Sequence, residues 1–210
     1  MQYSYIAIEG CIGAGKTSLA TRLSEQRKGT LILEEFSENT FLEKFYQNRE
    51  RYAFPLEVSF LVERFRQLQV MLPGKDLFGQ IHFSDYLFDK SLVFAQINLS
   101  GDHYQLFKKL FESLHGQLPR PDLIIYLYNT VENLQQNIRK RGRHFETGIP
   151  DSYLEDLQHS YLNYLKSLPN HKVILADVTE IDFVADGKNF HAIEGLLQQD
   201  FSEGITRIKL

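Results

Sequence analysis

Short apolar runs alternate with longer segments of helical periodicity along the whole chain. Five apolar runs predict strands, at residues 5–9, 30–33, 80–83, 123–128 and 172–176. Between them, apolar side chains recur every three or four residues and predict helices over residues 18–24, 39–46, 52–72, 91–99, 104–114, 131–140, 152–168 and 189–199. Pro73-Gly74 is expected to end the third helix. The alternation favours an α/β fold, with a five-stranded parallel sheet and helices on both faces.

The turn after the first strand carries a phosphate-binding motif. It has the P-loop spacing of Gly, four residues and Gly-Lys-Thr, and it stands between a strand and a helix as the motif requires. Glycines let successive N–H groups face phosphate oxygens, and the helix N-terminus adds partial positive charge. We expect Lys16 to reach the β- and γ-phosphates and Thr17 to bind Mg²⁺. The residues expected to bind the triphosphate are Gly10, Cys11, Ile12, Gly13, Ala14, Gly15, Lys16, Thr17 and Ser18.

Composition and charge narrow the class of protein. The chain has 210 residues, which fits one α/β domain, and its net charge of −4 argues against a nucleic-acid polymer as partner. Its single cysteine excludes an internal disulfide and fits a reducing compartment. Residues 1–4 resemble no signal peptide, and no apolar run approaches the roughly 18 residues of a membrane span. We therefore expect a cytoplasmic protein that contacts no membrane.

Acidic residues follow several predicted strands. Glu34 and Glu35 follow the second strand, Asp85 follows the third, and Asp177 follows the fifth. Because parallel strands end at one edge of the sheet, where ligands bind, this pattern indicates an enzyme. A glutamate there could accept a proton from an acceptor hydroxyl, or both glutamates could be solvated loop charges. Asp85 could hold Mg²⁺ through water, cap the next helix, or do both.

A basic segment ends the helix predicted over residues 131–140. It reads Arg-Lys-Arg-Gly-Arg from Arg139 to Arg143, which places four cations in five residues. Cations suit a helix C-terminus, and glycine suits the position that follows it. Four exceed what capping requires, so we favour a lid whose arginines neutralise the transferred phosphoryl group. A GTPase is disfavoured because the chain has no Asn-Lys-x-Asp sequence.

The lid sequence carries a family resemblance. Residues 141–150, Arg-Gly-Arg-His-Phe-Glu-Thr-Gly-Ile-Pro, and the Tyr153-Leu154-Glu155 that follows resemble the deoxynucleoside kinases, as does the stretch over residues 39–64. The resemblance implies one P-loop kinase domain over residues 1–210, with its lid at about 139–150. It also implies transfer of the γ-phosphoryl group of ATP, with Mg²⁺, to the 5′-hydroxyl of a deoxynucleoside, and a homodimer built through helices.

The same resemblance implies roles for individual residues. Glu34 falls on the catalytic base, and Lys16, Arg141 and Arg143 complete the catalytic set. Tyr46 and Glu146 fall on the pair that holds the sugar 3′-hydroxyl. The residues implied for the rest of the two substrates are Arg64, Glu57 and Asp85 for the nucleoside, and Arg139, Asp177 and Phe183 for ATP.

The chain also departs from the family pattern. It reads Glu34-Glu35-Phe36 where the family has Glu-Pro-Val, so either glutamate could be the base. It lacks the arginine that follows the family's third-strand acid, and Lys90, one helical turn beyond Tyr86, could replace that charge. Glu57 falls on a base-reading glutamine. An ionised Glu57 favours guanine and a protonated one favours adenine, so a purine is expected.

Two alternatives stay open. One is a nucleoside monophosphate kinase of the thymidylate kinase type, which shares the P-loop, strand-end acid and lid. Such an enzyme needs cations for the acceptor's phosphate, and Lys44, Arg49 and Arg51 have no evident role of this kind. The other is a nucleotide-binding regulatory module without catalysis, which the missing arginine favours and the retained Lys16 and Glu34 disfavour.

Overall fold

The computed structural model describes residues 3–35, 39–72, 80–146 and 148–210, and it centres on one parallel sheet. The sheet has six strands in the order β2-β3-β1-β4-β5-β6. The strands are β1 Tyr5–Gly10, β2 Thr30–Ile32, β3 His82–Ser84, β4 Leu123–Tyr128, β5 Lys172–Asp177 and β6 Gly204–Lys209. The expected α/β fold with a parallel sheet is confirmed, whereas the expected number of five strands is wrong.

The sixth strand escaped prediction because its sequence has no apolar run. Gly204–Lys209 reads Gly-Ile-Thr-Arg-Ile-Lys, and its side chains are half-buried or exposed. It lies at the edge of the sheet and pairs only with β5. Edge strands with charged side chains are common, since the charges oppose further pairing. The pattern of a buried strand therefore does not apply to it.

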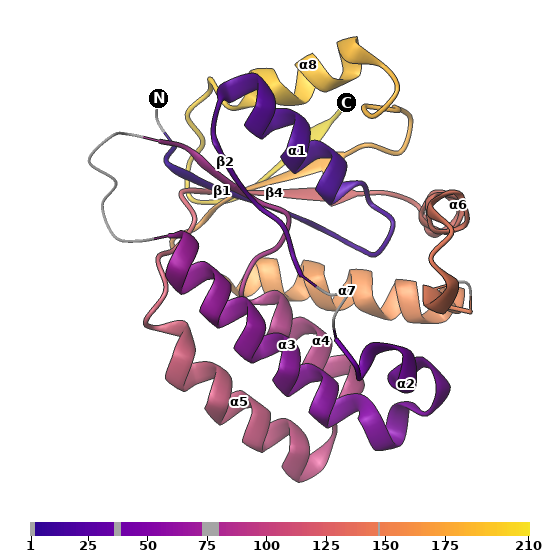
Figure 1. Ribbon diagram of the computed structural model, residues 1–210. Helices are drawn as coiled ribbons and strands as arrows, with labels where there is room; N and C mark the ends of the chain where they lie inside the picture. Colours follow the sequence, from indigo (N-terminus) through magenta and orange to yellow (C-terminus); the bar gives the residue numbers. More distant parts are fainter. Residues whose placement is uncertain (1–2, 36–38, 73–79, 147) are drawn as a thin grey trace.

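Helices cover both faces of the sheet, as expected. Figure 1 shows α1 and α8 on one face, and α3, α4 and α7 on the other, with α5 outside α3 and α4. The helices are α1 Lys16–Arg27, α2 Leu42–Gln47, α3 Arg49–Met71, α4 Lys90–Asn98, α5 Gly101–His115, α6 Val131–Arg141, α7 Asp151–Ser167 and α8 Gly187–Leu196, with a 3-10 turn η1 at His144–Glu146. Within the described residues, no helix is long and apolar enough to cross a membrane.

All eight helices lie where the apolar periodicity predicts them. Pro55 is the seventh residue of α3 and lies inside the helix, so the carbonyl group of Arg51 lacks the N–H that would otherwise bond to it. The side chain of Asn48 caps the same helix by accepting a hydrogen bond from the N–H of Arg51. Pro73 and Gly74, which we expect to end α3, lie outside the described residues, as do Phe36 and Thr147.

The central strands explain how the sheet positions a site. Every residue of β1 is buried, and so are five of the six residues of β4, because helices cover both faces there. β1 lies between β3 and β4, and β2 lies beyond β3. The carboxyl ends of β1, β2 and β3 are therefore neighbours. They deliver the P-loop, Glu34 and Asp85 to one edge of the sheet.

Candidate active site

The P-loop has the backbone that its glycines allow. Gly13 and Gly15 have φ angles of +84° and +89°, a region that favours glycine. A Cβ on Gly15 would lie 2.7 Å from Cζ of Phe183, so the loop and this ring are in close contact. The Lys16 ammonium donates to the carbonyl oxygens of Gly10 and Cys11, at 2.9 and 3.0 Å. These contacts hold Lys16 across the loop that would receive a triphosphate.

Asp85 connects the P-loop to the second strand. Thr17 Oγ1 donates to Asp85 Oδ2 at 2.6 Å, and the backbone N–H of Glu34 donates to Asp85 Oδ1 at 2.7 Å. Asp85 is buried, and the N-cap position of α4 belongs to Asp89, so Asp85 does not cap this helix. A hydroxyl beside a carboxylate is a set of oxygen ligands that suits Mg²⁺.

The Glu34 carboxylate bridges two buried cations. Its Oε1 accepts from Arg64 Nε at 2.8 Å and lies 2.6 Å from Arg64 Nη2, and its Oε2 accepts from Lys90 Nζ at 2.6 Å. Burial alone would raise the pKa of Glu34. The charges and hydrogen bonds of Lys90 and Arg64 outweigh burial and hold this pKa well below its usual range. Glu34 is therefore ionised at neutral pH.

The structure separates the two glutamates that the sequence left open. Glu34 lines the cavity, whereas Glu35 is exposed and accepts a hydrogen bond from Gln67 Nε2 at 3.3 Å. Tyr86, which stands where the family has an arginine, donates to Gln67 Oε1 at 2.6 Å. Lys90 supplies the buried cation, on the first residue of α4. The charge expected from Lys90 is thus at the site.

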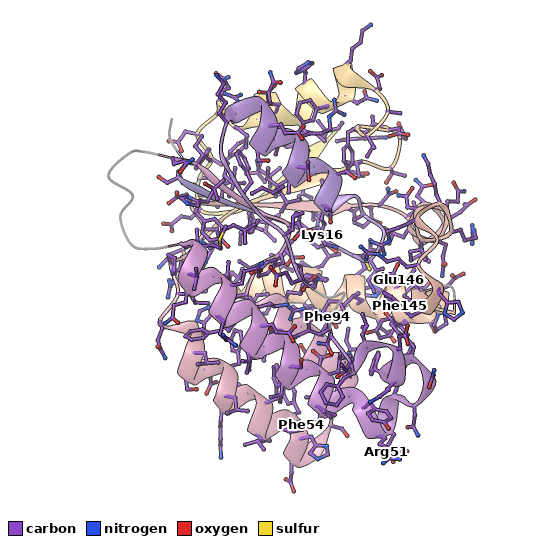
Figure 2. All side chains as sticks on the ribbon, in the orientation of Figure 1. Lys16, Arg51, Phe54, Phe94, Phe145 and Glu146 are labelled. Atoms are coloured by element: carbon purple, nitrogen blue, oxygen red, sulfur yellow. The ribbon has the colours of Figure 1, made fainter. Side chains whose placement is uncertain are left out.

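An open cavity lies between the sheet and the helices of one face. Figure 2 shows Lys16 at the sheet and Phe94, Phe145 and Glu146 facing it from the helices and the 3-10 turn, and these four residues line the cavity. Nine of its twenty lining residues are aromatic or aliphatic, and the others are polar or charged. The predicted nucleoside-binding residues all line it, namely Tyr46, Glu57, Arg64, Asp85 and Glu146.

Glu57 is a buried carboxyl in this cavity. Its Oε1 accepts from Asn98 Nδ2 at 2.7 Å, and the Tyr153 hydroxyl donates to Asn98 Oδ1 at 3.3 Å. Its Oε2 is buried and has no hydrogen-bond partner among the described residues. Burial raises the pKa of Glu57 to about 7, against smaller lowering effects of the Asn98 hydrogen bond and of Arg64. Glu57 therefore changes protonation near neutral pH.

The lid arginines contact Glu146. This buried carboxylate accepts a short hydrogen bond from Arg141 Nη2 and lies 3.3 Å from Arg143 Nη1. Phe145, the residue before it, stacks on Tyr46 with ring centroids 6.1 Å apart. Gly142, at a φ of +69°, ends α6 and turns the chain into η1. The basic segment thus caps a helix and also lines the site.

A second cavity lies on the other side of the P-loop. Its walls are the P-loop, one face of α6 and the segment over residues 181–184, which includes Phe183. Asn137 Nδ2 donates to the carbonyl of Gly13 at 2.9 Å, and Asn133 Nδ2 donates to that of Thr179 at 3.0 Å. Arg139 is exposed and Asp177 is half-buried, and neither is among the described residues that line the two cavities.

The two cavities meet at four residues. Lys16, Thr17, Arg141 and Arg143 line both of them. A group held in one cavity can therefore reach a group held in the other across a cluster of cations. This arrangement is typical of one class of protein, the P-loop kinases.

Sequence reasoning did not find several residues of the site. Asn98 and Phe94 line the first cavity but carry no motif, and Tyr153, which lies in the segment that resembles the family, lines it without having been given a role. Glu9 is another buried carboxylate, and it accepts hydrogen bonds from the N–H groups of Gly10 and Leu87 at 3.1 and 2.7 Å. Its position inside an apolar strand is a signal that could have drawn attention to it.

Comparisons with known proteins identify the family. The deoxynucleoside kinase family model matches residues 6–199. A deoxyguanosine kinase of Bacillus subtilis is 39% identical over 90% of this chain and 93% of its own length. A deoxyadenosine/deoxycytidine kinase of the same organism is 29% identical over 93% and 91%. In structure, a deoxyadenosine kinase from M. mycoides with bound dATP superimposes with a TM-score of 0.78 at 22% identity, over 93% of this chain and all of its own.

The chain therefore belongs to the deoxynucleoside kinase family. The enzyme class expected from the sequence, an ATP-dependent deoxynucleoside kinase, is confirmed. The family match disfavours the monophosphate kinase alternative. The buried Lys90 also removes the main argument for a module without catalysis, since a cation is present where the arginine is missing.

Proposed function

We propose that this protein transfers the γ-phosphoryl group of ATP to the 5′-hydroxyl of a purine deoxynucleoside, with deoxyguanosine preferred. The observation that carries the proposal is that two cavities share Lys16, Thr17, Arg141 and Arg143. The P-loop side takes ATP, and the side that holds Glu34 takes the nucleoside. In-line transfer needs donor and acceptor on opposite sides of the transferred group, with cations around it.

Glu34 is the proposed base for the 5′-hydroxyl. Its two cations make it a weak base, yet the transition state of phosphoryl transfer is loose and the hydroxyl gives up its proton late. A carboxylate that is ionised and fixed by Arg64 and Lys90 can orient the hydroxyl first and accept the proton at the end. Positioning is thus the larger part of its role.

The metal in this proposal is Mg²⁺. Thr17 would bind it through its hydroxyl and Asp85 through water, and the 2.6 Å contact between them supports a shared position. Among the described residues, no cluster of three or more His, Cys, Asp or Glu side chains offers a metal site of its own. The phosphates of ATP would supply the other ligands, and the ion would neutralise their charge during transfer.

The sugar is proposed to be 2′-deoxyribose without a phosphate. Tyr46 and Glu146 line the cavity and would hold the 3′-hydroxyl, and the stacked ring of Phe145 narrows the space beside them. The cations Lys44 and Arg51 are not among the described residues that line this cavity, and Arg64 and Lys90, which do line it, are already paired with Glu34. Both features favour a nucleoside over a nucleoside monophosphate.

The purine preference rests on Glu57. An ionised carboxylate accepts hydrogen bonds and does not donate them, and guanine presents two neighbouring donors on its Watson–Crick edge. The 39% identical relative is a deoxyguanosine kinase, which agrees with this reading. Arg64 lines the same cavity, but three of its N–H groups already face Glu34 and Ser91. Its contact with the base stays a prediction.

The proposal is tested by a coupled assay of ADP release over the four deoxynucleosides, their ribonucleoside counterparts and the deoxynucleoside monophosphates. We expect turnover with purine deoxynucleosides, highest specificity constant for deoxyguanosine, and dependence on Mg²⁺. A higher rate with deoxythymidine monophosphate than with any nucleoside would contradict the proposal and would support the alternative of a nucleoside monophosphate kinase.

Three further features belong to the proposal. Residues 1–210 would act as one kinase domain with its lid at about 139–150, and Arg139 and Asp177 would contact ATP only after movement of their segments. The protein would be a cytoplasmic homodimer that joins two copies through helices. Sedimentation equilibrium gives the mass in solution, and a mass of one chain would contradict the dimer.

A further inference from the structure

One buried group of the acceptor cavity has a capacity that the phosphoryl transfer itself does not use. Glu57 lines the cavity and is 1% exposed, and its Oε2 is buried and has no hydrogen-bond partner among the described residues. A buried polar atom without a partner is costly and is retained where a ligand completes it. The atom that would meet the acceptor's base is therefore this free oxygen.

We infer that Glu57 selects between guanine and adenine by whether its free oxygen carries a proton, and that Asn98 is the positioning residue that fixes which oxygen this is. The inference rests on the proposed function, since it names the acceptor's base as the ligand of Glu57. It goes beyond a fixed purine preference, because it assigns two selectivities to one side chain.

Asn98 makes the two carboxyl oxygens unequal. Its Nδ2 donates to Oε1 at 2.7 Å, and the Tyr153 hydroxyl donates to its Oδ1 at 3.3 Å, which keeps the amide in this orientation. An oxygen that accepts a strong hydrogen bond from an amide is the poorer place for a proton. When Glu57 is neutral, the proton therefore lies on Oε2, the oxygen that faces the base.

The two protonation states present opposite patterns to a base. Ionised Glu57 offers Oε2, and the second lone pair of Oε1, as acceptors for N1–H and the exocyclic amine of guanine. Neutral Glu57 donates from Oε2 to N1 of adenine, and its Oε1 accepts from the exocyclic amine of adenine. Each state opposes the wrong base, because a donor would face N1–H of guanine and an anion would face the lone pair of adenine N1.

Charged groups on several elements set the balance between the two states. The groups that face Glu57 or share its cavity are Arg64 on α3, Lys90 on α4, Glu34 after β2, Tyr46 on α2, Tyr153 on α7, Glu146 on η1, Lys16 on α1, Asp85 after β3, Arg141 on α6 and Arg143 after it. Burial raises the pKa of Glu57, whereas the Asn98 hydrogen bond, Arg64 and Lys90 lower it, and Glu34 raises it. The result is a pKa of about 7, so both states are populated near neutral pH.

The experiment measures kcat/KM for deoxyguanosine and deoxyadenosine with the full chain, ATP and Mg²⁺, between about pH 6 and about pH 8. Because kcat/KM reports the free enzyme, every other ionisation acts on both substrates and cancels in their ratio. We expect the ratio of deoxyguanosine to deoxyadenosine to rise about tenfold per pH unit, or about 100-fold over the range.

Three variants sharpen the test. Glu57→Gln places an amide nitrogen at the position of Oε2 and imitates the neutral state, so we expect a ratio that favours deoxyadenosine and does not change with pH. Asn98→Ala removes a hydrogen bond that lowers the pKa of Glu57, so we expect the rise in the ratio to move to higher pH. Glu63→Gln changes an exposed carboxylate of the same helix and is expected to keep the parental curve.

The outcomes separate the inference from the function beneath it. A ratio that stays constant with pH in the parent, while both nucleosides are phosphorylated, overturns the inference and leaves the kinase intact. A ratio that still rises in Glu57→Gln also overturns it, because another group would then be responsible. If Asn98→Ala keeps the parental dependence of the ratio on pH, Asn98 has no positioning role. Failure to phosphorylate any nucleoside instead contradicts the proposed function.

Discussion

The cavity proposed for ATP, here the donor cavity, and the cavity proposed for the nucleoside, here the acceptor cavity, share four residues. They are nevertheless built in different ways. At the P-loop, the donor cavity is lined by one continuous segment, residues 13–18, which includes Lys16 and Thr17. The acceptor cavity takes single side chains from α2, α3, α4, η1 and α7 and from the ends of β2 and β3. One is a local motif, and the other is an assembly of distant residues.

Their electrostatics differ as well. The wall of the donor cavity on α6 and before it consists largely of neutral amides, Asn129, Asn133, Gln136 and Asn137. The acceptor cavity holds buried charges in pairs, and the Glu34 carboxylate with Arg64 and Lys90 is the main example. Removing one partner of a buried ion pair leaves the other charge buried and unpaired. Substitutions in the acceptor cavity should therefore act through their neighbours, and those in the donor cavity should not.

The largest expected effect is that of Glu34→Gln. The substitution removes the proposed base and leaves Arg64 and Lys90 without their shared anion, so we expect the turnover number to fall by about 10²–10⁴-fold. The Michaelis constant for ATP should change little, because the donor cavity keeps its residues. Glu35→Gln is the matched control. A larger loss of turnover in that variant would mean that Glu35, and not Glu34, is the base. Lys16→Ala should also abolish most turnover, but through the phosphates.

The second prediction concerns stability rather than rate. In the folded protein the pKa of Glu57 is about 7, above its usual value of 4.5. The contribution of this proton to the free energy of unfolding is fully present below pH 4.5 and is lost as the pH rises from there through 7. Glu57→Gln avoids this loss, so its free energy of unfolding should exceed that of the parent by up to about 3 kcal/mol, since one pKa unit is about 1.4 kcal/mol.

Urea unfolding of the two proteins at about pH 5 and about pH 8 measures this difference. We expect it to be small at the lower pH and near its limit at the higher one. A difference of the same size at both pH values would mean that the proton on Glu57 does not contribute. A difference that grows with pH would also show that the acceptor cavity keeps a carboxyl group that lowers the stability of the folded protein.

The third prediction tests the residues that the cavities share. Arg141→Ala and Arg143→Ala should each lower the turnover number and the specificity constant together, by about 10²-fold, as the loss of one preorganised donor does elsewhere. The Michaelis constant for ATP should stay close to that of the parent. Arg66→Ala removes an exposed arginine of α3 and serves as control. A rise in that Michaelis constant alone would place the lid arginines in donor binding.

The smallest expected effect is that of Lys90→Ala, a fall of about tenfold in the specificity constant, comparable with the loss of one charged hydrogen bond. Arg64 would still neutralise Glu34, so the base would survive with a higher pKa. The acid side of the pH profile should therefore move to higher pH, and Lys90→Arg should restore it. An unchanged profile in Lys90→Ala would mean that this cation does not act on Glu34.

Local patterns explain what the sequence could predict. The eight helices, the five apolar strands and the P-loop each depend on residues close together in the chain. The strand-end position of Glu34 and Asp85 followed from the parallel sheet and is confirmed as a location, while their roles stay predictions. The edge strand β6 was missed because its side chains are half-exposed and mixed in polarity.

The distributed part of the site was harder to predict. Lys90 was expected to supply a charge, but its pairing with Glu34 joins residues 56 positions apart. The pairing of Asn98 with Tyr153 was missed because an amide and a phenol on separate helices give no spacing to recognise, although Tyr153 lies in the segment that resembles the family. Arg139 and Asp177 were expected at ATP because the family resemblance implies it, and neither is among the described residues that line the two cavities.

The contact between Gly15 and Phe183 has a consequence for redesign. The ring excludes a Cβ at Gly15, and Arg22 of α1 donates to the carbonyl oxygens of Phe183 and Val184 at 2.5 and 3.1 Å. The same guanidinium lies 4.0 Å from the ring centroid of Phe190 on α8. Substitutions that aim to change the phosphate donor must therefore be selected jointly across the start and the end of the chain. If the segment over residues 181–184 were replaced by that of a relative, the relative's P-loop and the arginine that corresponds to Arg22 would have to be transferred as well.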